Sequence, residues 1–246
     1  PFIRLKLAMT LDGKTALRNG NSKWITSDEA RADVQKLRAE SSAIVTGVQT
    51  VIDDDPRLQV TEISPEIKHR AEALSIERPV YILDSNLRAP ESAQLLTRDS
   101  VLQVCVEGVA SKAQQARYLE MPAVQGRVCL ESFVATLAER EHSMVLFECG
   151  ATLAGAMLNR ALVDELIIYV APRLIGSSGR SLLNLREIDR MSELVELSIN
   201  DVTEETLGTP AVILLEGYIW DLAEGPAVAA KAIEMARRYG GKVALS

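Results

Sequence analysis

The sequence predicts an α/β fold in which helices cover the faces of a central sheet. Short apolar stretches rich in Val and Ile alternate with amphipathic stretches, which is typical of strands covered on both sides. The 246 residues suit one large domain or two small ones. Hydrophobic residues make up 47% and charged residues 25%, a globular balance that excludes long disordered segments.

The predicted strands are short runs, several of them continuously apolar, and the predicted helices lie between them. The strands are residues 3–8, 43–47, 79–84, 101–106, 144–148, 165–171, 194–202 and 212–219. A capping box from Thr26 to Glu29 predicts a helix with Thr26 as its N-cap. Apolar residues at helical spacing predict two further helices over residues 152–162 and 227–239.

Charge and cysteine usage narrow the class of protein. Lys and Arg total 27 against 34 Asp and Glu, and no basic stripe is present, so a nucleic-acid partner is not expected. No apolar run reaches about 18 residues, which excludes a spanning helix. The N-terminus lacks a signal-peptide layout, and a chain that begins at Pro1 is expected to be a piece of a longer protein. Cys105, Cys129 and Cys149 are predicted to be reduced core thiols of a cytoplasmic protein, and no metal site is expected.

Several polar residues interrupt or follow predicted strands. Lys6 stands in an apolar strand, either as an edge residue whose amine reaches solvent or as a cation held in a cleft. Gly47 follows a strand and would let a dinucleotide approach the backbone. The acidic run at residues 53–55 is either a solvated turn or contains a carboxylate buried beside a reacting centre.

A strand, a glycine turn and a helix start follow one another after residue 144. Glu148 ends the strand, Gly150 makes the turn, and the free N–H groups of the next helix would suit a pyrophosphate. The G-x-G-x-x-G fingerprint is absent, and such turns also occur without a ligand. Because ligands of open α/β sheets gather at the carboxyl ends of strands, Glu148 is a candidate substrate contact.

Taken together, these stretches resemble the reductase domain of bacterial riboflavin biosynthesis proteins. The matching segments are residues 6–15, 22–27, 54–56, 83–85, 148–158 and 162–176. The resemblance implies a dihydrofolate-reductase-like fold with a mixed, mostly parallel central sheet, and a reductase domain over residues 1–205. It also implies a homodimer that uses NADPH to reduce the ribosyl group of 5-amino-6-(5-phosphoribosylamino)uracil to the ribityl form.

The resemblance further implies roles for individual residues. The NADPH-facing set, with Gly47 added from its turn, is Ala8, Trp24, Gly47, Thr50, Asp54, Ser85, Gly150, Ala151, Thr152, Leu153, Ala154, Gly155 and Ala156. The substrate-facing set is Ser22, Arg38, Leu58, Thr61 and Glu148, with Arg38 at the phosphate and Glu148 at the pyrimidine. Ser85 and Arg88 are candidates for the 2′-phosphate of the cofactor.

Two catalytic roles complete this hypothesis. Lys6 matches a lysine near the reacting sugar, where its positive charge would favour hydride addition to the imine formed by ring opening. Asp54 would position water, cofactor or sugar hydroxyls.

Two departures from the family leave alternatives open. Thr61 stands where the family commonly has a phosphate-binding arginine, for which Arg57 or Arg38 would have to compensate. Reduction of another pterin or pyrimidine, or a non-catalytic ligand-binding or dimerisation module, therefore stay as alternatives. The family's usual zinc deaminase, with its H-x-E and P-C-x-x-C motifs, is absent here and is expected in the full-length protein.

The C-terminal segment, residues 206–246, departs further from the family. It resembles an internal strand–helix–strand piece of ribokinase-type sugar and nucleoside kinases. The glycine-rich anion hole and catalytic aspartate of those kinases lie outside such a piece, so kinase activity is not expected. One interpretation is that residues 212–219 complete the reductase sheet.

Overall fold

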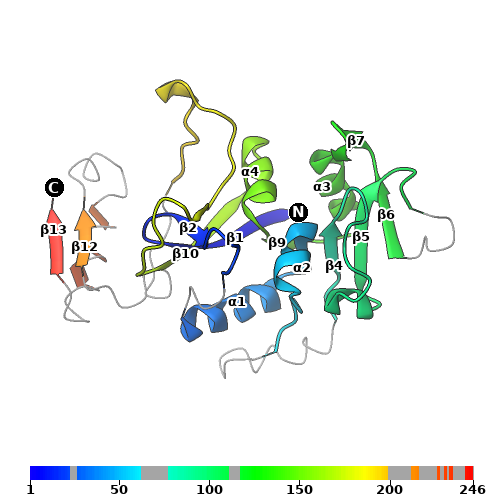
Figure 1. The fold of residues 1–246 in the computed structure, drawn as a ribbon, viewed down its shortest axis with the longest axis horizontal. Helices are drawn as coiled ribbons and strands as arrows, with labels where there is room; N and C mark the ends of the chain where they lie inside the picture. Colours follow the sequence, from blue (N-terminus) through cyan, green and yellow to red (C-terminus); the bar gives the residue numbers. More distant parts are fainter. Residues whose placement is uncertain are drawn as a thin grey trace. The chain divides into compact units, whose positions relative to one another are not determined.

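A parallel-rich sheet organises the chain. The computed structural model describes residues 1–22, 27–61, 77–110, 117–198, 212–215, 226–227, 230–231, 233–234 and 242–245. Its seven-stranded sheet has the order β10-β1-β9-β3-β4-β5-β6 (Figure 1). Neighbouring strands are parallel from β1 through to β6, which confirms the predicted α/β class. The strands are Phe2–Thr10 (β1), Ala43–Gly47 (β3), Val80–Leu83 (β4), Val101–Val106 (β5), Tyr118–Met121 (β6), Met144–Glu148 (β9) and Glu165–Ala171 (β10).

Helices and small strand pairs complete the described chain. The helices are Asp28–Glu40 (α1), Val48–Asp54 (α2), Leu130–Glu139 (α3) and Ala151–Asn159 (α4), with short 3-10 turns at Gln94–Thr97 (η2) and Met191–Glu193 (η4). The pairs are Lys14–Ala16 (β2) with Arg180–Ser181 (β11), Ala123–Val124 (β7) with Arg127–Val128 (β8), and Val212–Leu215 (β12) with Lys242–Leu245 (β13).

Alternating side chains of the sheet enter two different apolar clusters. Val45, Tyr81 and Leu83 belong to the first core cluster, which also contains residues of α3 and α4. Ile44 and Ile82 belong to the second core cluster, together with residues of α2. Because successive residues of a strand point to opposite faces, α2 covers one face of the sheet and α3 and α4 cover the other.

The chain divides into two compact units. The first contains Pro1–Leu7, Arg31–Ile167 and Ser181–Arg186, and the second contains Ala8–Ala30, Ile168–Arg180 and Glu187–Ser246. This division differs from the boundary at residue 205 that the sequence suggested. In the second unit, β12 and β13 pair in parallel as a separate two-stranded sheet, so residues 212–215 do not extend the seven-stranded sheet.

Two local predictions are corrected by the structure. Residues 194–198 of the predicted strand 194–202 form no strand, and residues 199–202 lie outside the described chain. Leu194, Val195 and Leu197 are 47%, 41% and 61% exposed, so this apolar pattern lacks the covered face that stabilises a strand. Helix α1 begins one residue later than expected, because the Ser27 hydroxyl accepts the Ala30 N–H at 3.3 Å. Thr26, the predicted N-cap, lies outside the described residues.

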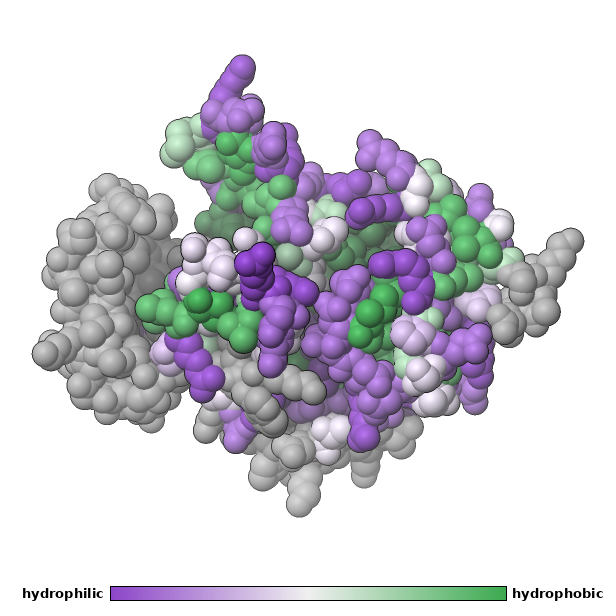
Figure 2. Space-filling model, in the orientation of Figure 1, coloured by the Kyte–Doolittle hydropathy of each residue, from purple (hydrophilic) through white to green (hydrophobic). Residues whose placement is uncertain are grey.

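The prediction of three reduced core cysteines is confirmed for the free thiols and wrong for the burial of two of them. All three cysteines are free thiols, and Cys105 is buried whereas Cys129 and Cys149 are only half-buried. Hydrophilic residues dominate the face shown in Figure 2, with apolar residues in smaller groups among them. Within the described chain, no helix has the length and apolar character needed to cross a membrane.

Candidate active site

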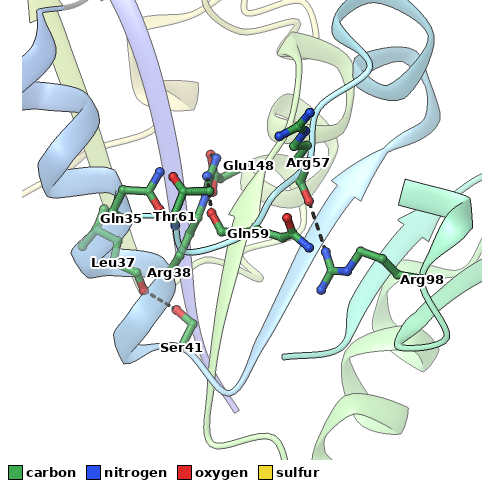
Figure 3. Close-up of polar contacts among 9 residues, drawn as sticks. All are labelled: Gln35, Leu37, Arg38, Ser41, Arg57, Gln59, Thr61, Arg98 and Glu148. Carbon is green, nitrogen blue, oxygen red and sulfur yellow. Dashed lines mark hydrogen bonds and ion pairs between the residues drawn. The ribbon is translucent and has the colours of Figure 1, made fainter. Parts of the chain in front are cut away.

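Three charged side chains meet where the carboxyl end of β9 lies beside the middle of β1. The parallel register places Lys6 beside Glu148, the last residue of β9. Arg38, in the last turn of α1, donates from Nε to Glu148 Oε1 at 2.5 Å and from Nη2 to Oε2 at 3.0 Å. Its Nη1 donates to the Gln59 carbonyl oxygen at 3.1 Å (Figure 3). Lys6 therefore lies on an interior strand beside an ion pair, and the edge-strand interpretation of this lysine is wrong.

Burial and charge set the protonation of this cluster. The Arg38 and Glu148 side chains are 15% and 11% exposed. Burial alone would raise the pKa of Glu148, but the charge and hydrogen bonds of Arg38, helped by Lys6, outweigh it and hold that pKa below its usual value. Burial lowers the pKa of Lys6, although Glu148 opposes the shift. The cluster thus keeps one firmly ionised carboxylate next to an amine that releases its proton more readily than usual.

A topological switch point lies next to this cluster. Strands β3 and β9 are neighbours, yet β3 continues into α2 on the face of the second core cluster and β9 continues into α4 on the opposite face. Open α/β sheets bind ligands outside the carboxyl ends of strands at such a point. The end of β9 beside Glu148 is therefore the candidate ligand-binding position of the fold.

Residues of the predicted cofactor set meet at this switch point. A methyl group on Gly150 would lie 4.0 Å from the Thr50 hydroxyl oxygen, and one on Gly47 would lie 3.5 Å from Leu153 Cδ2. The start of α2 and the start of α4 therefore lie side by side. Gly150 is the N-cap of α4, and among the described residues no side chain caps that helix end. The backbone N–H groups of its first turn can donate hydrogen bonds to a bound anion.

Two members of the predicted cofactor set are instead packed inside the protein. Ala154 is fully buried, and a methyl group on Gly155 would lie 2.1 Å from the Asn184 carbonyl oxygen. Asn184 donates from its backbone N–H to the Ala151 oxygen at 3.1 Å and from Nδ2 to Thr152 Oγ1 at 3.0 Å. The glycine at position 155 is thus explained by close backbone packing.

The other predicted cofactor contacts differ in burial and in hydrogen bonding. Ser85 follows β4, and its hydroxyl accepts the Val128 N–H at 3.1 Å. Asp54 is exposed at the end of α2. Ala8 is half-buried in the second unit, and Trp24 lies outside the described residues.

The predicted substrate contacts beyond Arg38 and Glu148 are less uniform. Leu58 is only 4% exposed and packs in the second core cluster, so its side chain is not open to a ligand. Thr61 is exposed, and its backbone N–H donates to Gln35 Oε1 at 3.1 Å (Figure 3). Arg57 donates to Gln94 Oε1 at 2.8 Å and is exposed. Ser22 is half-buried in the second unit.

Several residues that shape this region were not among the predicted site residues. Gln59 and Asn184 contribute through contacts that span 21 and 32 positions of the chain. Thr46 and Asp84 are buried at the ends of β3 and β4, and their strand positions were the only signal available. In the described part of the chain, no cluster of His, Cys, Asp and Glu could hold a metal ion.

Comparisons with known proteins agree with this architecture. Residues 1–209 match the family model described as the RibD C-terminal domain. The riboflavin biosynthesis protein RibD of Haemophilus influenzae is 35% identical over 207 residues, which cover 83% of this chain and 56% of that protein. A solved structure of Acinetobacter baumannii RibD superposes with a TM-score of 0.69 at 34% identity, covering 83% of this chain and 55% of that one.

A shorter relative matches along nearly its whole length. The 2,5-diamino-6-ribosylamino-4(3H)-pyrimidinone 5′-phosphate reductase of Methanothermobacter thermautotrophicus is 33% identical over 227 residues, covering 87% of this chain and 96% of that enzyme. By contrast, the chain spans just over half the length of the RibD proteins that it matches. The sheet order, the glycine turn at α4 and the match over residues 1–209 agree, and the chain belongs to the RibD C-terminal domain family.

Proposed function

We propose that this chain is an NADPH-dependent reductase that converts the ribosyl group of 5-amino-6-(5-phosphoribosylamino)uracil to the ribityl group. The observation that carries the proposal is Lys6 beside the Arg38–Glu148 ion pair, next to the switch point of the sheet. A cation and a paired carboxylate at this position suit a polar sugar and a pyrimidine. Membership of the RibD C-terminal domain family supports the same reaction class.

The residues at the switch point fit a dinucleotide. The N-terminal end of α4 offers backbone N–H groups to the pyrophosphate, and Thr50 lies against Gly150 with a hydroxyl that can donate a hydrogen bond. Ser85 and Arg88 follow β4, where a hydroxyl and an exposed guanidinium suit a 2′-phosphate. NADPH bound here would supply the hydride, while the protein orients the reacting atoms and excludes water.

Each member of the ion cluster has a distinct part in this proposal. Lys6 places positive charge beside the sugar, where it favours hydride acceptance at the imine carbon. Glu148 accepts hydrogen bonds from the pyrimidine while its two oxygens stay bound to Arg38. Because Arg38 is already paired with Glu148, the substrate phosphate would need a further donor. Exposed Arg57, close in sequence to Thr61, is the candidate.

A second phosphorylated pyrimidine is an alternative to the proposed substrate. The Methanothermobacter relative is named for a 2,5-diamino-6-ribosylamino-4(3H)-pyrimidinone 5′-phosphate, which carries an amino group where the uracil substrate carries oxygen. Thr61, in place of an arginine, gives no direct preference between the two pyrimidines. A homodimer, a cytoplasmic location and a separate deaminase region in the full-length protein belong to the same proposal.

The test is loss of NADPH absorbance with each phosphorylated pyrimidine, followed by mass analysis of the product. We expect turnover with the uracil substrate and a product that has gained one hydride and one proton. Turnover with the diaminopyrimidinone alone would overturn the substrate assignment and keep the reductase. Cofactor binding without turnover on either pyrimidine would favour a non-catalytic binding module.

A further inference from the structure

Two buried polar atoms lie at the ends of neighbouring strands. Thr46 on β3 and Asp84 directly after β4 are 0% exposed. Within the described chain, Thr46 Oγ1 and Asp84 Oδ1 have no hydrogen-bond partner. A buried hydroxyl or carboxylate oxygen is costly to leave unpaired, and native proteins usually satisfy such atoms with protein groups or ordered water.

The strand register brings these two atoms to the same corner of the sheet. Thr46 is opposite Ile82, and Asp84 is two residues beyond Ile82, so all three side chains point to the face of the second core cluster. Strand spacing and rise place the Thr46 and Asp84 Cα atoms about 8 Å apart. Gln103, opposite Ile82 on β5, is 7% exposed, and its Nε2 lies 3.5 Å from Asp84 Oδ2. This polar corner, made of Thr46, Asp84 and Gln103, borders an otherwise apolar cluster.

We propose that Thr46 Oγ1 and Asp84 Oδ1 bind one internal water molecule between the carboxyl ends of β3 and β4, and that this water fixes two segments of the NADPH site. The corner has the chemistry that a buried water needs, since a hydroxyl can donate or accept and a carboxylate accepts. A divalent cation is a poorer occupant, because calcium takes six to eight oxygen ligands and magnesium about six.

Thr46 and Asp84 would affect cofactor binding through their neighbours in the chain. This part of the inference rests on the proposed function. Thr46 precedes Gly47 and helix α2, which carries Thr50 against Gly150. Asp84 precedes Ser85, and its other oxygen, Oδ2, accepts the Ala89 N–H at 2.8 Å. Thr46 and Asp84 are therefore positioning residues: a water between them would hold the start of α2 at a fixed distance from the loop after β4.

The functional test replaces Thr46 with valine, which keeps the shape and removes the hydroxyl. We expect Thr46→Val to raise the NADPH dissociation constant about tenfold, equivalent to about 1.4 kcal/mol, while kcat at saturating NADPH changes much less. Thr46→Ser keeps the hydroxyl and should bind NADPH like the wild type. An unchanged dissociation constant in Thr46→Val, or an equal loss in both variants, would contradict the positioning role.

A crystal structure of the wild-type chain tests the water itself, whether or not the chain is a reductase. We expect density for one water within hydrogen-bond distance of Thr46 Oγ1 and Asp84 Oδ1, and its loss in Thr46→Val. A direct hydrogen bond between the two side chains, or from each to the protein backbone, with no water between them would overturn the proposal. A water in a protein that binds no NADPH would instead refute the proposed function and leave the water site standing. The wild-type crystal decides even where the valine variant fails to fold.

Discussion

Lys6 is held where burial disfavours its charge, and this has opposite consequences for stability and for activity. The lowered pKa of Lys6 means that desolvation outweighs the attraction of Glu148. Arg38 binds both oxygens of Glu148, so we expect this carboxylate to stay paired when the amine is removed. We therefore expect Lys6 to add little to the free energy of unfolding, whereas the proposed reaction needs its charge.

Replacing Lys6 with methionine should separate these two effects. We expect Lys6→Met to lower kcat by about 100-fold or more, in the range typical of a lost electrostatic or acid–base contribution, with little change in NADPH binding. The midpoint of thermal unfolding should stay the same or rise, because a buried charge is replaced by an apolar side chain of similar length. Activity assays and thermal melts of the same preparation measure both. Unchanged turnover would eliminate the catalytic role of Lys6.

Replacing Glu148, unlike replacing Lys6, should destabilise the protein, because Glu148 neutralises the charge of Arg38. Glu148→Gln leaves a guanidinium that is 15% exposed without its anionic partner, and we expect the free energy of unfolding to fall by about 3 kcal/mol. Glu165→Gln is the matched control, since Glu165 is 35% exposed and its partner Arg4 also contacts Glu40. Urea unfolding of both variants gives the comparison. Equal losses would show that the Arg38–Glu148 pair contributes no more to stability than the Arg4–Glu165 pair does.

Among the structural elements, helix α4 shows how a glycine can serve packing within a ligand-binding segment. In most helix interiors Gly→Ala stabilises by up to about 1 kcal/mol. At Gly155 the added methyl group would lie 2.1 Å from the Asn184 carbonyl oxygen, a backbone atom that cannot rotate away. We therefore expect Gly155→Ala to destabilise the protein by about 1–3 kcal/mol.

The matched control for this prediction is Gly47→Ala. The methyl group there would make an ordinary contact of 3.5 Å with Leu153 Cδ2, so the free energy of unfolding should change little. Urea midpoints of the two variants measure the difference. A Gly155→Ala variant as stable as the wild type would mean that residues 181–186 move aside easily and do not fix α4.

The elements that the sequence predicted well are those whose pattern is local. Strands β3, β5, β9 and β10 have the predicted bounds, because each is a short apolar run between polar residues. Helix α2 was missed, since its seven residues end in the acidic run that suggested a turn. Helix α3 was missed although Leu130, Phe133 and Leu137 form a helical stripe that the structure buries.

The candidate site was likewise predictable where the pattern is local and not where contacts are long-range. Glu148 and Gly150 are found at the strand end and helix start that the sequence indicated. The partners of Arg38 and Gly155 come from distant segments, and contacts across 110 or about 30 positions leave no local pattern. Residue types at strand ends could therefore be predicted, whereas the contacts that fix their charge and orientation could not.

At the scale of the whole molecule, the contact between Tyr81 and His142 connects a buried core residue to a titratable group. Tyr81 is 1% exposed in the first core cluster and packs edge to face on Phe133, with ring centroids 5.8 Å apart. Its hydroxyl lies 2.9 Å from His142 Nε2, and a neutral imidazole can accept that hydroxyl's hydrogen. Burial, helped by the nearby charge of Arg140, lowers the pKa of His142.

This arrangement predicts a loss of stability in mildly acidic solution. A histidine whose pKa is lower in the folded state binds fewer protons than the unfolded chain below about pH 6.5, so its contribution is present above that pH and disappears as the pH falls through the folded-state pKa. Urea midpoints of the wild type should fall between pH 7.5 and pH 5, and those of His142→Gln should fall less, because glutamine does not titrate. Subtracting the two profiles removes the carboxylates that also titrate at low pH, such as Glu77, whose pKa is lowered by hydrogen bonds from Ser100 and Arg98. Parallel profiles would mean that the folded protein accommodates a protonated His142 as well as the unfolded chain does, and that the Tyr81 contact contributes nothing specific to the neutral form.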